Sequence, residues 1–254
     1  MFCGTDIIVR QAIQAGSGRS IHNYLELAET AFEAGNFTEA YDYYSMALEI
    51  DVKNTKAWFG KGKSAGWQST IEDSRFPEMI SGFKKSIDYS SNENKKSLQI
   101  LCASEIAQLF QSYYNLIRKD AIDHSSVEGV WKNYVSQSRN LMHLLEFGHS
   151  LDPDNHEIIL DIIRICKNIL DGMSYEYHTR NGPIQGVRRV SEVDKRFFSK
   201  KIYDYSTLLE KDDPNFKPPS IQRKYLSIEE GWVYFIVIII LIIFSFWIFN
   251  GFNL

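Results

Sequence analysis

Cysteine is scarce in this sequence, and its histidines do not cluster. The 254 residues include only three cysteines, Cys3, Cys102 and Cys166, and none of them forms a CxxC pair. This excludes a disulfide-built scaffold and predicts free thiols in a reducing compartment. The six histidines form no HxxxH motif, and His143 and His149 are six residues apart, which is off the spacing that brings two ligands together on a helix. We therefore expect no metal site and no cofactor.

The sequence also lacks a strong charge of one sign. Its 28 Lys and Arg against 32 Asp and Glu give a net charge of −4, and 44% of its residues are apolar. These values exclude a wholly disordered chain and a strongly basic nucleic-acid-binding protein. The average hides an asymmetry, because residues 1–177 hold 17 basic and 24 acidic residues whereas residues 178–254 hold 11 and 8.

Residues 232–249 form a run of 18 residues without any charge, and 14 of them are Ile, Val, Leu or Phe. As a helix this run is about 27 Å long, which matches the hydrocarbon core of a bilayer. The run predicts a single C-terminal transmembrane helix. Its basic flank, Lys217, Arg223 and Lys224, lies upstream, so we expect a cytoplasmic N-terminal domain and a short non-cytoplasmic tail at 250–254. We expect a tail anchor and no secretory signal peptide; the sequence does not identify the membrane.

Residues 22–54 carry apolar and small residues at helical spacing on either side of a Gly35-Asn36 turn. This pattern predicts a helical hairpin in which small residues allow the two helices to approach closely. It resembles the tetratricopeptide repeat, which has aromatic, Leu, small, Gly and Ala residues at matching offsets. The residues that carry the resemblance are Tyr24, Leu27, Ala28, Ala31, Gly35, Phe37, Ala40, Tyr44 and Ala47.

A second unit at about 55–90 begins with Trp58, Gly62 and Ala65 at repeat positions, and its second helix starts late, at Phe76. Later units are degenerate. We expect further helices at 95–122, 127–150, 156–177 and 192–211, with a loop from Asn181 to Gly186 before the last one. The predicted fold is therefore an all-α, TPR-like α-solenoid. The predicted organisation is an N-terminal extension (1–20), the helical repeat domain (21–215), a linker (216–231), the membrane helix (232–249) and the tail (250–254).

The stretch 57–64, AWFGKGKS, fits the loosest form of a phosphate-binding P-loop. A functional P-loop follows a β-strand and turns its backbone N–H groups toward the phosphates. Here the repeat pattern already explains Trp58 and Gly62, and no Val- or Ile-rich strand precedes the stretch. Nucleotide binding is therefore the weaker alternative, and we do not expect an enzyme.

The run from Arg180 to Lys201 contains seven basic and two acidic residues. One interpretation is contact with anionic lipid headgroups through Arg188, Arg189, Lys195 and Arg196. Another is nucleic acid, which the thin aromatic content disfavours. The plain alternative is a solvated helix face. We expect no nucleic-acid partner.

The tetratricopeptide resemblance implies a concave face, lined by the first helix of each hairpin, that binds segments of partner proteins. Counted from the matched positions, its candidate residues are Leu25, Glu29, Phe32, Lys56, Phe59, Lys63 and Trp67. The expected function is a membrane-tethered interaction scaffold or adaptor. The main alternative is a structural subunit of a larger membrane complex.

Overall fold

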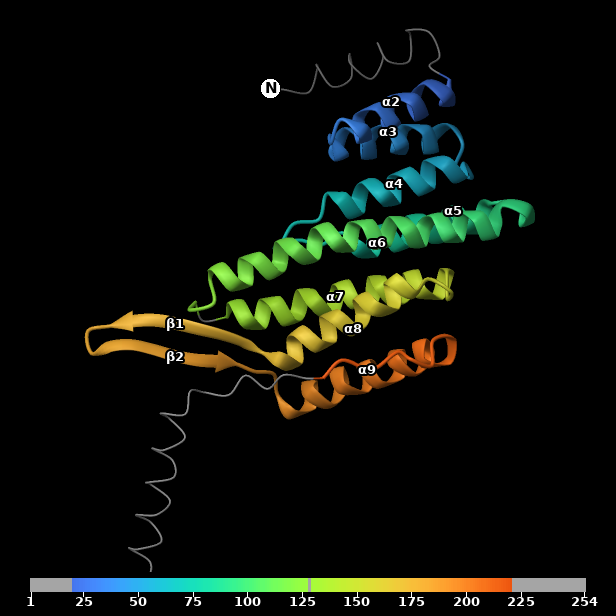
Figure 1. The fold of residues 1–254 in the computed structure, drawn as a ribbon. Coiled ribbons are helices and arrows are strands. Elements are labelled where there is room, and N and C mark those ends of the chain that lie inside the picture. Colours follow the sequence, from blue (N-terminus) through green and yellow to red (C-terminus); the bar gives the residue numbers. More distant parts are fainter. Residues whose placement is uncertain (1–19, 128, 221–254) are drawn as a thin grey trace, which may run out of the picture. The chain divides into compact units, whose positions relative to one another are not determined.

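A computed structural model describes residues 20–127 and 129–220 (Figure 1). Within these ranges the helices and strands follow in this order: α2 Ile21–Glu33, α3 Phe37–Ile50, α4 Thr55–Trp67, α5 Phe76–Tyr89, α6 Asn92–Asp123, α7 Val130–Leu151, α8 His156–Asp171, β1 Met173–Thr179, β2 Gly182–Arg188 and α9 Glu192–Asp212. The described part is mostly helical, as predicted. None of the helices in this part is both long and apolar enough to span a bilayer. The predicted membrane helix at 232–249, its tail and most of the N-terminal extension lie outside the described residues.

The chain groups into two compact units. Unit 1 consists of the residues up to Leu116 together with Arg139–Ile158. Unit 2 consists of Ile117–Ser138 and the residues from Ile159 onward. The borders between the units therefore fall inside α6, α7 and α8.

In unit 1, α2 and α3 form the predicted first hairpin. Ser20 caps α2 by accepting a hydrogen bond from the Asn23 backbone N–H, and Asn36 caps α3 through the N–H of Glu39. Gly35 between them has a φ of +78°, a left-handed conformation that glycine adopts without steric cost. The apolar stripe faces inward, so Ala28, Ala40 and Ala47 form part of a buried cluster.

Helices α4 and α5 form the second hairpin, and they meet backbone to backbone. A Cβ atom added to Gly82 would lie 2.6 Å from Gly62 Cα and 2.9 Å from the Trp58 carbonyl oxygen. Only two glycines allow this approach, which explains why Gly62 falls on a small-residue position of the pattern. Ser86 strengthens the crossing, because its Oγ donates a 2.7 Å hydrogen bond to the Thr55 carbonyl.

The rest of unit 1 comes from the N-terminal part of α6 and the C-terminal part of α7, close to the predicted helices 95–122 and 127–150. Tyr113 of α6 packs edge-on against Phe76, and its hydroxyl donates a 2.7 Å hydrogen bond to the Thr70 carbonyl. Gly148 of α7 leaves room for Ile106 and Ile158. The late start of α5 is therefore accommodated by an ordered connection fastened to α6.

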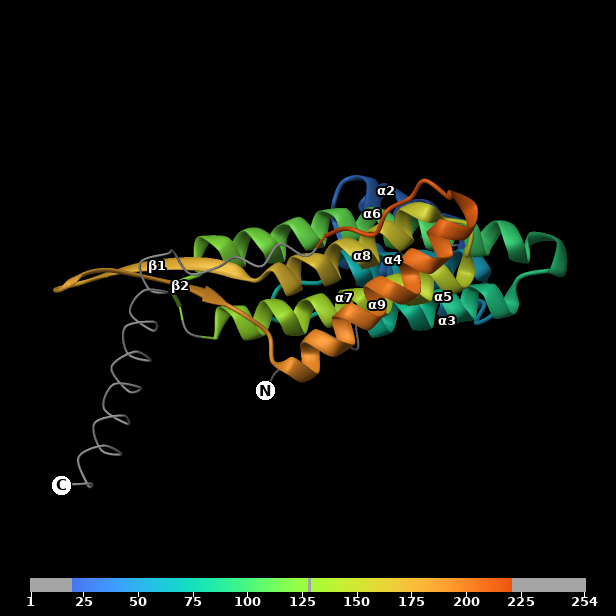
Figure 2. The same cartoon turned by 60° about the horizontal axis from the view of Figure 1, so that its bottom comes forward.

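Unit 2 corrects the all-α prediction. The helix expected at 156–177 ends at Asp171, and residues 173–188 form an antiparallel β-hairpin (Figure 2). Gly172, with a φ of +78°, ends α8, and Arg180-Asn181 forms the turn, followed by Gly182 at the start of β2. Tyr175, Tyr177 and Ile184 favour strands, and their alternation with polar residues has the period of a strand rather than of a helix.

Candidate functional site

The seven predicted site residues lie on α2 and α4 of unit 1, the helices that open the first two hairpins. Helix α6 follows as the next opening helix, and the ion pair described below brings its Glu105 to α4. Ion pairs link Glu29 to Lys56 and Lys63 to Glu105, and a groove described below places Leu98 and Leu101 beside Thr55. We refer to Glu29, Phe32, Lys56, Lys63, Leu98, Leu101 and Glu105 together as the α2/α4/α6 face. Its members differ in what they contact and in how far they are exposed.

Glu29 and Lys56 form an ion pair across α2 and α4. The Lys56 Nζ atom lies 2.6 Å from Glu29 Oε1, and both side chains are about half exposed. An exposed pair of this kind contributes only about 0–1 kcal/mol to stability. Each of the two side chains can therefore leave its partner and pair with a charged group of a ligand at little cost in free energy.

Lys63 has a more enclosed position. Its Nζ atom lies 2.8 Å from Glu105 Oε1 and 4.3 Å from the centre of the Phe32 ring. Glu105 is only 7% exposed, and its other carboxylate oxygen, Oε2, has no hydrogen-bond partner among the described residues. The pair thus places a buried carboxylate, neutralised by one lysine, between α4 and α6.

The acidic groups act on nearby side chains. Burial raises the pKa of the Tyr44 phenol, and the negative charges of Glu29 and Glu105 raise that pKa further. Burial, with a smaller contribution from Glu105, raises the pKa of the Cys102 thiol to about 12. Tyr44 therefore stays neutral at physiological pH, and Cys102 stays a buried thiol rather than a reactive thiolate.

Leu25, Phe59 and Trp67 are engaged within the protein. Leu25 belongs to the buried cluster of the first hairpin. Phe59 stacks on the fully buried Phe83, with 5.2 Å between ring centroids, and Trp67 packs against Phe37 at 5.6 Å. These three residues hold the hairpins together, so changing them would disturb folding as well as any binding.

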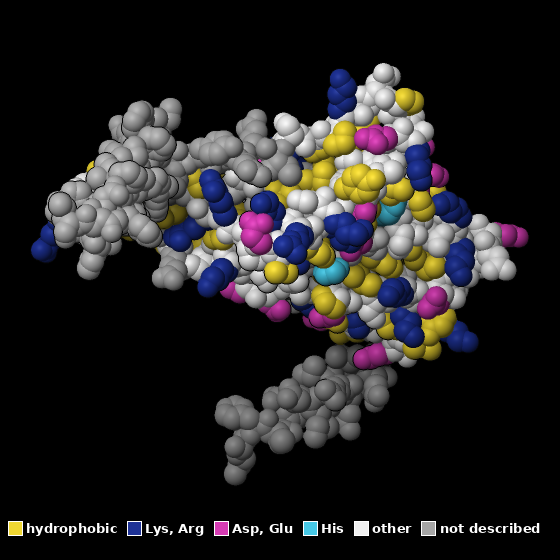
Figure 3. Space-filling view, turned by 90° about the horizontal axis from the view of Figure 1, so that it is seen from below, with side chains coloured by type: hydrophobic (Ala, Val, Ile, Leu, Met, Phe, Trp, Pro, Cys, Tyr) yellow, Lys and Arg dark blue, Asp and Glu magenta, His cyan; other side chains and the backbone are white. Residues whose placement is uncertain are grey.

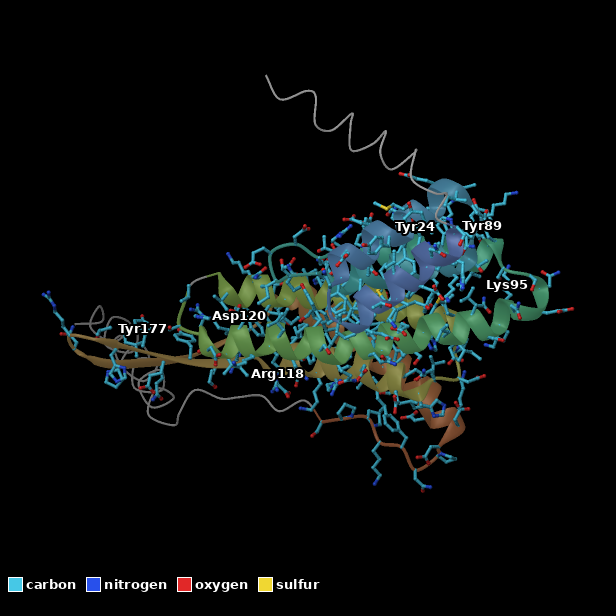
Figure 4. All side chains as sticks on the ribbon, turned by 90° about the horizontal axis from the view of Figure 1, so that it is seen from above. Tyr24, Tyr89, Lys95, Arg118, Asp120 and Tyr177 are labelled. Atoms are coloured by element: carbon cyan, nitrogen blue, oxygen red, sulfur yellow. The ribbon has the colours of Figure 1, made fainter. Side chains whose placement is uncertain are left out.

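Sequence reasoning missed a groove at the start of α6. It has a volume of about 510 Å³ and is lined by Thr55, Tyr89, Ser90, Ser91, Asn94, Ser97, Leu98 and Leu101. Figure 4 labels Tyr89, which lines this groove, and Lys95, which lies within the same stretch of α6 as Asn94 and Ser97. Leu101 is 45% exposed beside it. The repeat pattern is degenerate after residue 90, so the sequence could not assign these residues to a face.

The P-loop-like stretch 57–64 lies inside α4. Its backbone is helical, Gly60 faces the Tyr44 ring, and Gly62 faces Gly82. The loop that would turn N–H groups toward a phosphate is absent from this stretch, so the nucleotide-binding alternative has no structural support here. Within residues 20–127 and 129–220, no three His, Cys, Asp or Glu side chains gather as a metal site.

The four basic residues considered for lipid contact lie in unit 2, where Arg189 and Lys195 line one pocket together. Arg188 lies over the Tyr175 ring, the Arg189 carbonyl accepts a hydrogen bond from Trp131, and Lys195 pairs with Glu192 at 3.2 Å. Arg196 is exposed on α9. Figure 3 shows basic side chains interspersed with acidic ones over the visible face.

Comparison with known proteins leaves the family open. No family model matches the chain, and no curated protein matches it. One solved structure, "YrrB: a TPR protein with an unusual peptide-binding site", is 11% identical, and the match covers 81% of this chain and 92% of that one at a TM-score of 0.30. A likeness of this strength carries no conclusion about family or function, so the assignment of helical hairpins rests on the structure itself.

Proposed function

We propose that this protein is a membrane-tethered interaction scaffold whose α2/α4/α6 face binds a segment of a partner protein. The observation that carries the proposal is the groove of about 510 Å³ that Leu98 and Leu101 of α6 line together with Thr55, the residue next to Lys56 of the Glu29–Lys56 pair. The groove combines Tyr89, Leu98 and Leu101 with hydroxyl and amide side chains, and binding sites commonly pair apolar contact with a few polar groups that orient the ligand.

The membrane part of the proposal is supported by the sequence of residues 232–249. Eighteen uncharged residues are long enough to cross a bilayer, and the basic flank upstream favours a cytoplasmic helical domain. A domain tethered in this way is confined to a thin layer, which raises its effective concentration for other membrane-bound proteins. Deletion of 232–249 followed by membrane fractionation tests this part, and retention at the membrane would contradict it.

Site-specific photo-crosslinking in the full chain tests the binding face. A photoreactive amino acid at Leu101 should give a covalent adduct with a protein, whereas the same group at Met46 should not. Met46 is a matched control because it is 38% exposed, close to the 45% of Leu101, but lies on α3. The substitution Lys56→Glu should abolish the adduct at 101. Equal adducts at both positions, or none at 101, would refute the assignment of the face.

A further inference from the structure

The β-hairpin of unit 2 has two different faces. In the antiparallel register Met173 pairs with Arg188, Tyr175 with Gly186 and Tyr177 with Ile184, so these side chains share one face. The opposite face carries Ser174, Glu176, His178, Pro183, Gln185 and Val187. One side of the hairpin is therefore aromatic and apolar with a cation, and the other is largely polar.

The first of these, the aromatic face, is ordered by its own contacts. The Tyr175 and Tyr177 rings stack with centroids 6.1 Å apart, and the Arg188 guanidinium lies 4.2 Å from the centre of Tyr175. Gly186 leaves room for the Tyr175 ring, since a Cβ atom there would collide with it. These contacts hold the aromatic rings in place without a third strand.

The same face is open to solvent in the described part of the chain. Tyr177 is 41% exposed and Ile184 is 42% exposed, and Figure 4 shows Tyr177 on the stretch of hairpin that extends beyond α8 and α9. An isolated two-stranded hairpin with an uncovered apolar face is marginally stable in water. A surface that covers Tyr177 and Ile184 would stabilise the hairpin.

The charge of the hairpin indicates what kind of surface could cover Tyr177 and Ile184. Residues 173–191 contain three arginines, Arg180, Arg188 and Arg189, and one acidic residue, Glu176, so the segment is positive. Tyrosine beside arginine is the composition found at membrane interfaces, where the ring lies at headgroup level and the cation meets anionic lipid. Pro183 lacks an N–H group in β2, which disfavours the alternative of a partner's strand adding to that edge.

The connection to the proposed membrane helix brings such a surface within reach. Only eleven residues, 221–231, separate Ser220 from residue 232. Fully extended they span at most about 40 Å. Each strand has seven residues and is therefore about 23 Å long. The tether thus keeps Ser220 within about 40 Å of the bilayer, less than twice the length of a strand of the hairpin.

We propose that the aromatic face of the β1–β2 hairpin docks on the anionic surface of the bilayer that residues 232–249 enter, with Tyr177 and Ile184 at headgroup level and Arg180, which is exposed at the turn, against the lipid charges. The proposal rests on the proposed membrane tethering and deepens it. The docked hairpin is a second attachment beside the membrane helix, and it restricts how the tethered domain turns above the membrane.

The test uses the full-length protein reconstituted into vesicles of phosphatidylcholine, with or without phosphatidylserine. An environment-sensitive fluorophore is attached at Ile184→Cys or, as the matched control, at Gln185→Cys. These neighbours lie on opposite faces of β2. Cys3 is replaced by Ser in both variants, while Cys102 and Cys166 are buried.

We expect headgroup-linked nitroxide lipids to quench the label at 184 and not the label at 185, and only in vesicles that contain phosphatidylserine. Replacing Arg180 by Gln should lower the ratio of docked to free hairpin about fivefold, because each basic residue near an anionic surface contributes about 1 kcal/mol. Salt at about 1 M should abolish the quenching, since the screening length falls to about 3 Å.

Equal quenching at 184 and 185, or quenching that is independent of phosphatidylserine, would overturn the proposal. The proposal would also be wrong if the label at 184 were shielded from an aqueous quencher only after membrane proteins are added. The aromatic face would then bind a protein and not the lipid. Flotation of the vesicles separates this failure from failure of the tethering. If the protein floats with the vesicles but the label at 184 stays unquenched, only the hairpin proposal is wrong. If the protein does not float, the proposed membrane tethering is wrong.

Discussion

The helical crossing of α4 and α5 and the β1–β2 hairpin are built in opposite ways. At the crossing two glycines bring backbones into contact, and Phe83 is fully buried beside them. In the hairpin Tyr177 and Ile184 are about 40% exposed. Large aromatic residues are present in both regions, but only at the crossing do they stabilise the fold through burial. The exposed Tyr177 ring of the hairpin therefore contributes little to a core.

The largest expected effect tests the helical side of this comparison. Phe83→Ala removes a ring that is fully buried and stacked on Phe59. We expect a loss of about 4 kcal/mol in the free energy of unfolding, from lost burial and the cavity that remains. Urea denaturation followed by circular dichroism measures it. A loss below about 1 kcal/mol, the range of surface substitutions, would show that the crossing is not a packed core.

The next prediction adds atoms instead of removing them. Gly82→Ala places a Cβ atom 2.6 Å from Gly62 Cα. We expect a net loss of about 2 kcal/mol, because overpacking costs more than the helix propensity that alanine contributes. Ser81→Ala, at an exposed position of the same helix, is the control and should change stability by less than about 0.5 kcal/mol. A stabilised Gly82→Ala variant would contradict the backbone contact.

These two predictions also show what the sequence could reveal. Gly62 and Ala65 at repeat positions predict close helix packing, and the predicted late start of the helix at Phe76 is confirmed. Glu105 could not be assigned to the candidate site, because its importance comes from Lys63, which is 42 residues away in the chain. The sequence does not predict the strands, because Tyr175 and Tyr177 also fit the end of a helix, although the Asn181-Gly182 pair that borders the observed turn is common in hairpins.

A third prediction compares buried and exposed charge within the helical region. Lys63→Met leaves the Glu105 carboxylate without its counter-ion and should cost about 1.5 kcal/mol, the lower range for a hydrogen bond to a charged group. The double variant Lys63→Met, Glu105→Leu should recover most of this loss, because it also removes the buried charge. Lys56→Met, at the exposed pair with Glu29, should change stability by less than about 0.5 kcal/mol. Denaturant midpoints of the variants measure these differences, and equal losses for Lys63→Met and Lys56→Met would contradict the enclosed position of Glu105.

The helical region should also respond to pH through His149. Burial lowers the pKa of this imidazole below its usual 6.5, against the opposing charges of Asp152 and Glu146. The unfolded chain therefore binds a proton at a higher pH than the folded protein does, so stability is complete above about pH 7.5 and falls as the pH drops from about 6.5 toward the lowered value. His149→Gln should flatten this part of the stability–pH curve. An unchanged slope would show that the imidazole does not titrate differently on unfolding.

The smallest expected effect tests the hairpin side of the comparison. Tyr177→Ala makes the same kind of change as Phe83→Ala but at a 41% exposed position, and should change the free energy of unfolding by about 0.5 kcal/mol or less. A loss as large as that of Phe83→Ala would abolish the distinction between the two regions. The circular dichroism melts of the two variants provide the measurement.

The contact between Gly62 and Gly82 limits how evolution or selection could repair damage there. In an ordinary core a larger residue can be offset by a smaller one opposite, but each of these positions already holds the smallest residue and faces the backbone of the other. A side chain introduced at either glycine therefore cannot be compensated by a smaller residue at the other. Compensation then requires the two helices to move apart, which depends on the chain that joins them, residues 68–75. Suppressor substitutions and changes of length should therefore accumulate in that connection.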